Sequence, residues 1–375
     1  MRKLMKLELN SLSSVAPKLK NYLSPDYIYI PLEVNYKLKL QENKKVLKGE
    51  DITDAAISYV SGRACGIKNC FTIDGLERCL VIENDFKEQS KKLKKSSNEE
   101  IFNYFSAELS NKLSNKTNNL IFSIIEDEPL VYTYAMLVNN YFQDLLDTID
   151  YLKESFNYHN VYIVIKDNEK KNIENLISTL GIYPYIKLIT VPNIYPILNT
   201  DYLFNVLNIK EGVILNPEEV YEINCVLRCR KNVTEKYLSI SGTAINPCVI
   251  NVKLGTNVNE ILKFAKVKYN DCDIFLNGCI SGIKVNQIAD LIVTKDLRAL
   301  VLNKKEEAKT VKCIRCGLCK AFCPAGINPK YIYENKQKIA KEYLDKCLKC
   351  GLCNYVCPSY IDLKGAIKVG EQNEN

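Results

Sequence analysis

The chain has 375 residues, of which 47% are hydrophobic and 25% charged, and its formal net charge is +7. This length predicts two or three domains, and the composition is that of a globular protein rather than a disordered or fibrous one. No stretch approaches the roughly eighteen consecutive apolar residues that would span a bilayer, and the basic N-terminus lacks the apolar core of an export signal. With one histidine, His159, and no tryptophan, histidine-based acid–base catalysis and histidine-rich metal sites are nearly excluded.

Sixteen cysteines are a high number for such a chain. A secreted disulfide scaffold would be short and would carry an export signal, so the cysteines indicate metal or redox chemistry in a reducing compartment. The basic clusters, at the N-terminus, over residues 87–95 and near residue 313, lack the basic–aromatic pattern of nucleic-acid binding, so we expect no nucleic acid partner. Two interpretations of these clusters stay open: a solvated surface, and a docking surface for an acidic redox protein.

The first part of the chain is expected to comprise an N-terminal extension over residues 1–23 and a strand-rich domain over residues 24–86. Segments such as "YIYIPLEV" and "RCLVIEND" have the composition and turn boundaries of short β-strands. The sequence pattern "VLKGEDI" followed by "SG" is similar to that of a lipoyl- or biotinyl-type hammerhead (barrel-sandwich hybrid) domain. No lysine occupies the hairpin tip at which a carrier would be modified, so we expect a structural role for this domain.

Within this domain, "CFTIDGLERC" predicts a β-hairpin with Cys70 and Cys79 on its two strands. If Asp74 and Gly75 form a two-residue turn, as this dipeptide does in type I′ turns, the two cysteines lie directly opposite each other. Cysteines at such positions can reach disulfide distance, so one interpretation is a redox dithiol that passes electron pairs. The alternative is a pair of buried, inert thiols.

The middle of the chain is expected to alternate strands and helices. Residues 87–118 predict a polar linker with one helix, and residues 119–235 a Rossmann-like domain that contains strands such as "NVYIVIKD" and helices such as "NEKKNIENLISTLG". Residues 236–305 give two strands, a Gly-Thr turn, a helix and further strands, as in a β-grasp (SLBB-like) unit. The predicted fold class is therefore multidomain α/β.

The strongest indication of function in the sequence lies in residues 306–375. The segments "CIRCGLCKAFCP" (313–324) and "CLKCGLCNYVCP" (347–358) share the pattern C-x2-C-x2-C-x3-C-P. Three cysteines at this spacing wrap around one corner of an iron–sulfur cube, and in two-cluster ferredoxins the fourth ligates the other cluster. We therefore expect two [4Fe–4S] clusters in a ferredoxin-like α-helical module. The predicted ligands are Cys313, Cys316, Cys319 and Cys357 for cluster 1, and Cys347, Cys350, Cys353 and Cys323 for cluster 2.

The alternative for these eight cysteines is a pair of zinc sites. Zinc ribbons usually pair C-x2-C knuckles across a longer gap and need neither the third cysteine nor the Cys-Pro. Gly317 and Gly351 follow the second cysteine, where a side chain would obstruct N–H groups directed at sulfur, and Pro324 and Pro358 end the helix of the crossing ligand. The pattern therefore favours clusters over zinc.

In this order, the hammerhead, the Rossmann-like domain, the β-grasp unit and the two-cluster module resemble the C subunit of the Rnf electron-transport complex over residues 24–368. The segments "IEDEPLVYTY" and "ISGTAINPCVINVKLGT" and both cysteine repeats carry the resemblance. The segments "CLVIENDFKE" and "IEDEP" are also similar to a clostridial branch, the proline reductase-associated electron transfer protein. The resemblance implies that Glu126 and Glu128 correspond to carboxylates of a flavin (FMN) and NADH site.

The chain departs from this family at the flavin loop. Members that oxidise NADH carry G-G-x-G-F-P-T before the E-x-E-P element, because glycines let the backbone approach phosphates. Here no glycine occurs between Gly75 and Gly181, and the corresponding stretch reads "EEIFNYFSAELSNKLSN". Glu126 and Glu128 remain as candidate cofactor carboxylates, but without the loop the sequence favours a structural role for them and argues against bound FMN.

Three functions follow from these observations. The first, which we favour, is a relay that passes low-potential electrons through two [4Fe–4S] clusters to a partner reductase or to a membrane Rnf-type complex. Proline reductase is one candidate reductase, and ferredoxin and flavodoxin are further candidate partners. The second is an FMN-dependent NADH dehydrogenase subunit with a divergent loop, and the third an iron–sulfur scaffold or redox sensor. We expect a cytoplasmic protein that reaches the inner face of the membrane only through partners.

Overall fold

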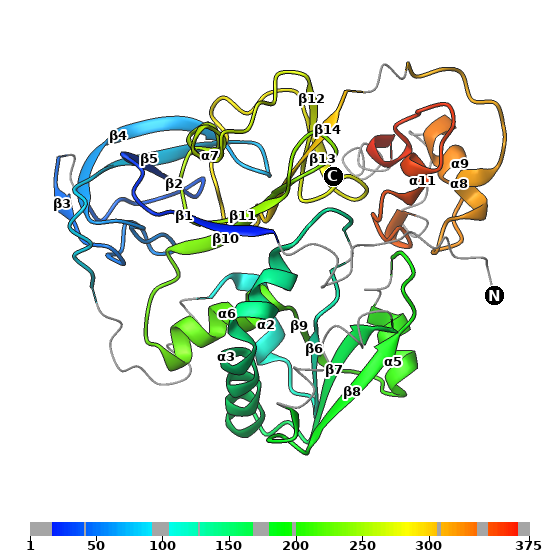
Figure 1. Cartoon of the computed structure of the whole chain (residues 1–375), viewed down its shortest axis with the longest axis horizontal. Coiled ribbons are helices and arrows are strands. Elements are labelled where there is room, and N and C mark those ends of the chain that lie inside the picture. Colours follow the sequence, from blue (N-terminus) through cyan, green and yellow to red (C-terminus); the bar gives the residue numbers. More distant parts are fainter. Residues whose placement is uncertain are drawn as a thin grey trace.

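The computed structural model describes residues 17–40, 43–91, 105–126, 128–167, 180–196, 200–305, 309–335 and 344–366. In this part of the chain, three β-sheets with their helices form the body of the molecule, and a group of short helices lies at one side of it (Figure 1). None of the described helices is long and apolar enough to cross a lipid bilayer.

The first domain is an antiparallel sheet with the strand order β2-β5-β4-β3. Its strands are β2 (Tyr27–Pro31), β3 (Lys45–Val46), β4 (Gly62–Phe71) and β5 (Leu76–Asn84). Ile28 and Ile30 of β2 are buried while Tyr27, Tyr29 and Pro31 are not, which is the period of two of a half-buried strand. They pack against Ile82 of β5 in a common core. The region predicted to be rich in strands therefore forms one sheet.

The second domain is a parallel sheet with the order β8-β7-β6-β9, which we call the parallel-sheet domain. It comprises β6 (Asn119–Ser123), β7 (Asn160–Lys166), β8 (Ile186–Val191), β9 (Val213–Leu215), and the helices α2 (Ala107–Ser114), α3 (Thr133–Ser155), α5 (Thr200–Leu207), α6 (Pro217–Ile223) and η3 (Asn224–Arg228). Helices α3 and α6 pack on one face of the sheet and α5 on the other (Figure 1). The helix expected within residues 168–181 lies mostly outside the described residues.

Strand β6 lies inside this sheet, with β7 on one side and β9 on the other. In open parallel sheets, ligands bind at the carboxyl ends of the strands where the order reverses. The chain leaves β6 at that point and runs directly into Glu126 and Glu128. The fold therefore places the two predicted carboxylates at the position where such sheets carry their sites.

The third domain is a mixed sheet with the order β1-β11-β10-β14-β12-β13, which we call the mixed-sheet domain. Its elements are β1 (Lys18–Tyr22), β10 (Glu235–Ser241), β11 (Cys248–Lys253), α7 (Val258–Ala265), β12 (Cys272–Leu276), β13 (Ile283–Val285) and β14 (Ala299–Lys304). Strand β1 pairs in parallel with β11 at the edge of this sheet. Residues 18–22, expected to be part of an N-terminal extension, are thus a strand of a distant domain. Sequence reasoning missed this strand because its pairing partner lies more than two hundred residues further on.

The fourth unit, the cluster module, contains α8 (Leu318–Ala321), α9 (Pro329–Glu334) and α11 (Leu352–Tyr355). The two cysteine repeats have the same backbone form, since Arg315 and Gly317 in the first and Lys349 and Gly351 in the second all have positive φ angles. Each of α8 and α11 starts directly after its glycine. Helix α11 lies on the side of the module toward the mixed-sheet domain, and α8 and α9 lie on the far side (Figure 1).

Candidate functional site

The eight cysteines of the two repeats line two separate cavities. The first is lined by Cys313, Cys316, Cys319 and Cys357, and has a volume of about 30 Å³. The second is lined by Cys323, Cys347, Cys350 and Cys353, and has a volume of about 20 Å³. Each cavity thus receives three cysteines from one repeat and the last cysteine of the other repeat.

The backbone of each loop is shaped to surround its cavity. Positive φ angles at the residues before and after the second cysteine, 59° at Arg315 and 77° at Gly317, curl the first loop. The second loop has 52° at Lys349 and 75° at Gly351. In that loop the N–H of Lys349 donates to the sulfur of Cys347 at 3.4 Å. Such N–H···S contacts place donors around the sulfur ligands of a cluster.

The cysteines of each set line one common cavity. Among the residues that the structure describes, no three His, Cys, Asp or Glu side chains meet as the ligands of a single metal ion do. Structural zinc needs four ligands within about 2.3 Å of one ion. Three thiols of one repeat and one of the other around a common cavity are the donor set that holds a [4Fe–4S] cluster in two-cluster ferredoxins, so the cysteines fit clusters.

Several of these thiols are buried enough to change their titration. Burial raises the pKa of Cys353 to about 12, and it also raises the pKa values of Cys319 and Cys350. At neutral pH these groups are therefore protonated when no metal is bound. Because thiolates are the ligands, assembly of the clusters must release protons.

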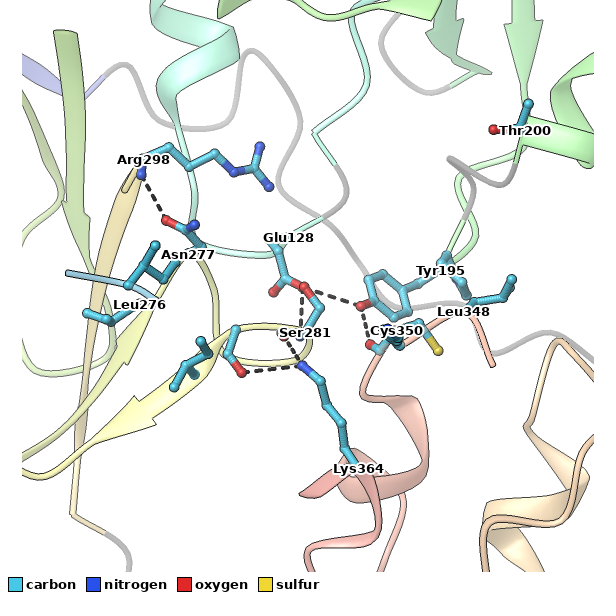
Figure 2. A pocket seen from close by; sticks show the side chains of 15 residues that line it. Glu128, Tyr195, Thr200, Leu276, Asn277, Ser281, Arg298, Leu348, Cys350 and Lys364 are labelled. Carbon is cyan, nitrogen blue, oxygen red and sulfur yellow. Dashed lines mark hydrogen bonds between the residues drawn. The ribbon is translucent and has the colours of Figure 1, made fainter. Parts of the chain in front are cut away.

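Glu128 lies where three domains meet (Figure 2). Its side chain is buried, and its carboxylate accepts hydrogen bonds from the backbone N–H groups of Ile280 at 3.2 Å and Ser281 at 2.7 Å. Both donors belong to the loop between β12 and β13. Lys364 of the cluster module donates to the carbonyl oxygens of Ser281 and Gly282 in the same loop. An acid of the parallel-sheet domain and a lysine of the cluster module therefore hold this loop between them.

Tyr195, which follows β8, connects the same junction to the second cysteine repeat (Figure 2). Its hydroxyl lies 2.5 Å from the carbonyl oxygen of Cys350, to which it donates, and 3.3 Å from Oε1 of Glu128. Its ring packs with Ile280 and Leu352. Sequence reasoning did not identify Tyr195, Ser281 or Lys364 as site residues, because nothing in the local pattern indicates contacts between such distant segments.

A cavity of about 650 Å³ opens at this junction, and Arg298 lies on its wall together with Glu128, Tyr195 and Cys350. The guanidinium of Arg298 pairs with Glu126 at 3.0 Å and lies 5.1 Å from the centre of the Tyr134 ring. The two acids that the resemblance assigned to a flavin and NADH site are therefore both engaged by groups of the protein.

The structure describes only the second part of the stretch that stands in place of the flavin loop, residues 105–115. Helix α2 occupies the described end of that stretch, and its Lys112 pairs at 2.6 Å with Glu219 of α6. Neither helix contributes a glycine through which backbone could approach a phosphate. The described residues here, with the acids Glu126 and Glu128 already engaged, therefore do not fit FMN, and we derive no step through it.

The predicted direct opposition of Cys70 and Cys79 is wrong. In the hairpin of β4 and β5, Cys70 lies opposite Glu77, and Cys79 lies opposite Lys68. The reason is the turn: Thr72 donates its N–H to the carbonyl of Gly75 at 2.8 Å, so the connection contains four residues and is centred on Ile73 and Asp74.

The two thiols nevertheless share one face of the hairpin. Both are buried, beside Ile292. A hydrogen bond between them lowers the pKa of Cys70 and raises that of Cys79. The pair is therefore close in space, although diagonal rather than opposite. The turn of the same hairpin reaches the junction, because Ile73 lines the cavity that Cys350 also lines.

Comparisons with known proteins agree with this picture of the C-terminal module. Residues 312–361 match the 4Fe–4S dicluster domain family. The C subunit of the ion-translocating oxidoreductase complex of Buchnera aphidicola (subspecies Acyrthosiphon pisum) is 24% identical over 354 residues, covering 82% of this chain and 75% of that protein. The same subunit of Rhodobacter capsulatus is 26% identical over 226 residues, covering 56% of this chain and 44% of that protein. That of Yersinia pestis is 27% identical over 245 residues, covering 59% and 39%.

These matches confirm the resemblance to the C subunit of Rnf-type complexes and the presence of two [4Fe–4S] clusters. The chain spans less than half the length of the Rhodobacter and Yersinia relatives. Among solved structures, an NAD+-reducing [NiFe]-hydrogenase in its H2-reduced state is similar, with a TM-score of 0.48 and 9% identity over 71% of this chain and 57% of that one.

Proposed function

We propose that this protein is an iron–sulfur electron-transfer protein that relays low-potential electrons through two [4Fe–4S] clusters to a partner reductase or to a membrane Rnf-type complex. The observation that carries the proposal is the division of eight cysteines between two cavities in one small module. Each cluster, when bound, accepts and gives one electron at a time. The chain's own part is to hold the two clusters close together and to shape the surfaces at which partners meet them.

The ligand assignment of the proposal follows the crossover pattern. Cluster 1 would be held by Cys313, Cys316, Cys319 and Cys357, and cluster 2 by Cys347, Cys350, Cys353 and Cys323. The lining of the two cavities supports this assignment, because Cys323 faces the cavity of the second repeat and Cys357 that of the first.

The domain identities in the proposal are a hammerhead domain over 24–86, a Rossmann-like domain over 119–235 and a β-grasp unit over 236–305. The parallel order β8-β7-β6-β9 with helices on both faces supports the second, and the β10-β11 hairpin followed by α7 supports the third. The Rossmann-like domain would then be a structural body that holds cluster 2 through Tyr195, not a cofactor site. We place the protein in the cytoplasm, where partners would bring it to the membrane. Proline reductase remains a candidate partner, because "CLVIENDFKE" is similar to the proline reductase-associated electron transfer protein.

The test is anaerobic purification followed by metal and flavin analysis. We expect about eight irons and eight acid-labile sulfides per chain and no stoichiometric FMN after acid release. We also expect reduction of both clusters by a strong chemical donor but little NADH oxidation by the protein alone. Stoichiometric FMN with rapid NADH turnover would instead support the dehydrogenase alternative, and zinc in place of iron would overturn the proposal.

A further inference from the structure

The two cysteine loops are nearly identical in sequence but have opposite surroundings. A Cβ atom built on Gly351 would lie 1.9 Å from the carbonyl oxygen of Ile280, whereas one built on Gly317 would meet nothing within 4 Å. The following leucines differ in the same way, since Leu352 is 1% exposed and Leu318 is 37% exposed. The second loop is therefore sealed against the mixed-sheet domain, and the first faces solvent.

This asymmetry gives the module an inner and an outer end. The inner end is the loop 347–353, which Tyr195 and the loop of Ile280 cover and beside which the cavity of about 650 Å³ opens. At the outer end, the loop 313–319 encloses only the first cysteine cavity, of about 30 Å³. A redox partner of the outer cluster therefore has to meet it across a surface.

The surface at the outer end has an apolar centre. Val311 is 53% exposed, Ile314 64% and Tyr360 54%. Hydrogen bonds from Val311 N–H to the carbonyl of Ser359 and from the Thr310 hydroxyl to the carbonyl of Tyr360 tie these two segments together beside Cys357. We call the exposed residues of 309–320 together with Tyr360 the outer face. Exposed apolar side chains gathered in this way are typical of a protein contact site.

The rim of the outer face is positively charged. Lys309, Lys312, Arg315 and Lys320 are exposed, and the sequence contains no Asp or Glu between residues 309 and 333. At the inner end, the position equivalent to Lys320 is Asn354. Four cations here oppose the negative charge that a cluster and its thiolates bring, and they attract an acidic partner by long-range steering.

We propose that the outer face is the docking surface for a small acidic one-electron carrier protein, of the flavodoxin or ferredoxin type. The inference rests on the proposed electron-transfer function and assigns direction to it. The carrier would be oxidised by one electron, and the cluster held by Cys313, Cys316, Cys319 and Cys357 would be reduced by it. The cluster of the second loop, at the junction, would be the next acceptor. Complexes of this kind are small and transient, with a few apolar contacts inside a charged rim, and the outer face has that composition.

The test reverses the charge of three lysines on the rim and leaves the cysteine ligands in place. The triple variant Lys309→Glu, Lys312→Glu, Lys320→Glu is compared with a control of equal net charge, Lys37→Glu, Lys116→Glu, Lys268→Glu, whose three lysines are exposed elsewhere. The probe is a reduced acidic flavodoxin, whose one-electron oxidation is followed by stopped flow at low ionic strength. We expect the second-order rate constant to fall at least about tenfold in the rim variant and to stay within about twofold of wild type in the control. The difference should shrink as salt is raised, because the interaction is screened.

A small uncharged donor, photoreduced deazaflavin, distinguishes failure of the docking inference from failure of the proposed electron-transfer function. It should reduce the clusters of wild type, rim variant and control at similar rates. If it does, and the flavodoxin rate is the same in the rim variant and the control, the docking inference is wrong while the relay function stands. If deazaflavin reduces the clusters of none of the three proteins, the proposed function itself fails.

Discussion

The hydroxyl of Tyr195 donates a hydrogen bond to the carbonyl oxygen of Cys350, 155 positions further along the chain. One side chain of the parallel-sheet domain therefore holds the backbone of a cluster loop directly. The same hydroxyl lies beside Glu128, which fixes the loop of Ile280 and Ser281 against that cluster loop. Glu128, for which the resemblance implied a flavin and NADH site, therefore lies at the junction that holds the second cysteine loop.

Replacing Tyr195 by Phe should weaken the hold on cluster 2. The substitution leaves the part-buried carbonyl of Cys350 without its donor, which costs about 0.5–1.5 kcal/mol because water can reach it from the junction cavity. We expect cluster 2 to be lost to an iron chelator several-fold faster than in wild type, while cluster 1 is lost at the wild-type rate, as followed by EPR under anaerobic conditions. Tyr355→Phe is the matched control, since Tyr355 is 52% exposed on α11. Equal loss of both clusters in Tyr195→Phe would contradict the anchoring role.

The crossover of ligands predicts which cluster each variant damages. Cys316→Ala and Cys350→Ala, each within one loop, provide reference EPR spectra for loss of cluster 1 and cluster 2. Cys323→Ala should then give the spectrum of Cys350→Ala, and Cys357→Ala that of Cys316→Ala, because Cys323 and Cys357 line the cavities of the opposite repeats. If Cys323→Ala instead resembled Cys316→Ala, each repeat would hold its own cluster.

The sequence predicted the cluster module well because its information is local. Spacing of cysteines over about eleven residues specifies the loop, and the same left-handed residues recur at Arg315, Gly317, Lys349 and Gly351. The alternation of strands and helices after residue 119 was predictable for the same reason, since period and turn residues lie within each segment.

The junction could not be predicted because its contacts are not local. Glu128 meets Ser281 across 153 positions, and Lys364 meets the same loop across 83. Strand β1 similarly depends on β11 for its pairing. The error at Cys70 and Cys79 is of another kind: Asp74–Gly75 has the sequence of a two-residue turn, but the connection closes between Thr72 and Gly75, and this shifts the pairing by two positions. A shift of two keeps both side chains on the same face, so the two thiols still meet.

The dithiol role of Cys70 and Cys79 remains a prediction, and it is testable. If the pair passes electrons, Cys70→Ala should slow delivery to a two-electron acceptor at least about tenfold while one-electron reduction of the clusters is unchanged. Cys65→Ala is the control, because Cys65 is exposed on the same strand. If Cys70→Ala delivers electrons at the wild-type rate, and both thiols of the unsubstituted protein stay reduced after its clusters are oxidised, the pair has a purely structural role in the hairpin core.

The last prediction concerns Lys253, a cation that joins two domains. It is 2% exposed, and its ammonium pairs with Glu235 at 2.7 Å and with Glu88 at 3.0 Å. Burial alone would raise the pKa of Glu235, but Lys253 and Lys48 bring that pKa below its usual value, so the carboxylate stays charged at neutral pH.

Lys253→Met would therefore leave two acids facing each other with only Lys48 between them. We expect the free energy of unfolding to fall by about 3 kcal/mol, the low end for a broken buried pair, because Glu88 is half exposed. The thermal midpoint at pH 7, measured anaerobically, should fall accordingly, and Lys263→Met, at an exposed position of α7, should leave it unchanged. Adding Glu235→Gln to Lys253→Met should restore part of the loss, because it removes one of the two uncompensated charges. A double variant less stable than Lys253→Met alone would contradict this explanation, because it would show that Glu235 stabilises the fold through other contacts, such as its pairing with Lys48.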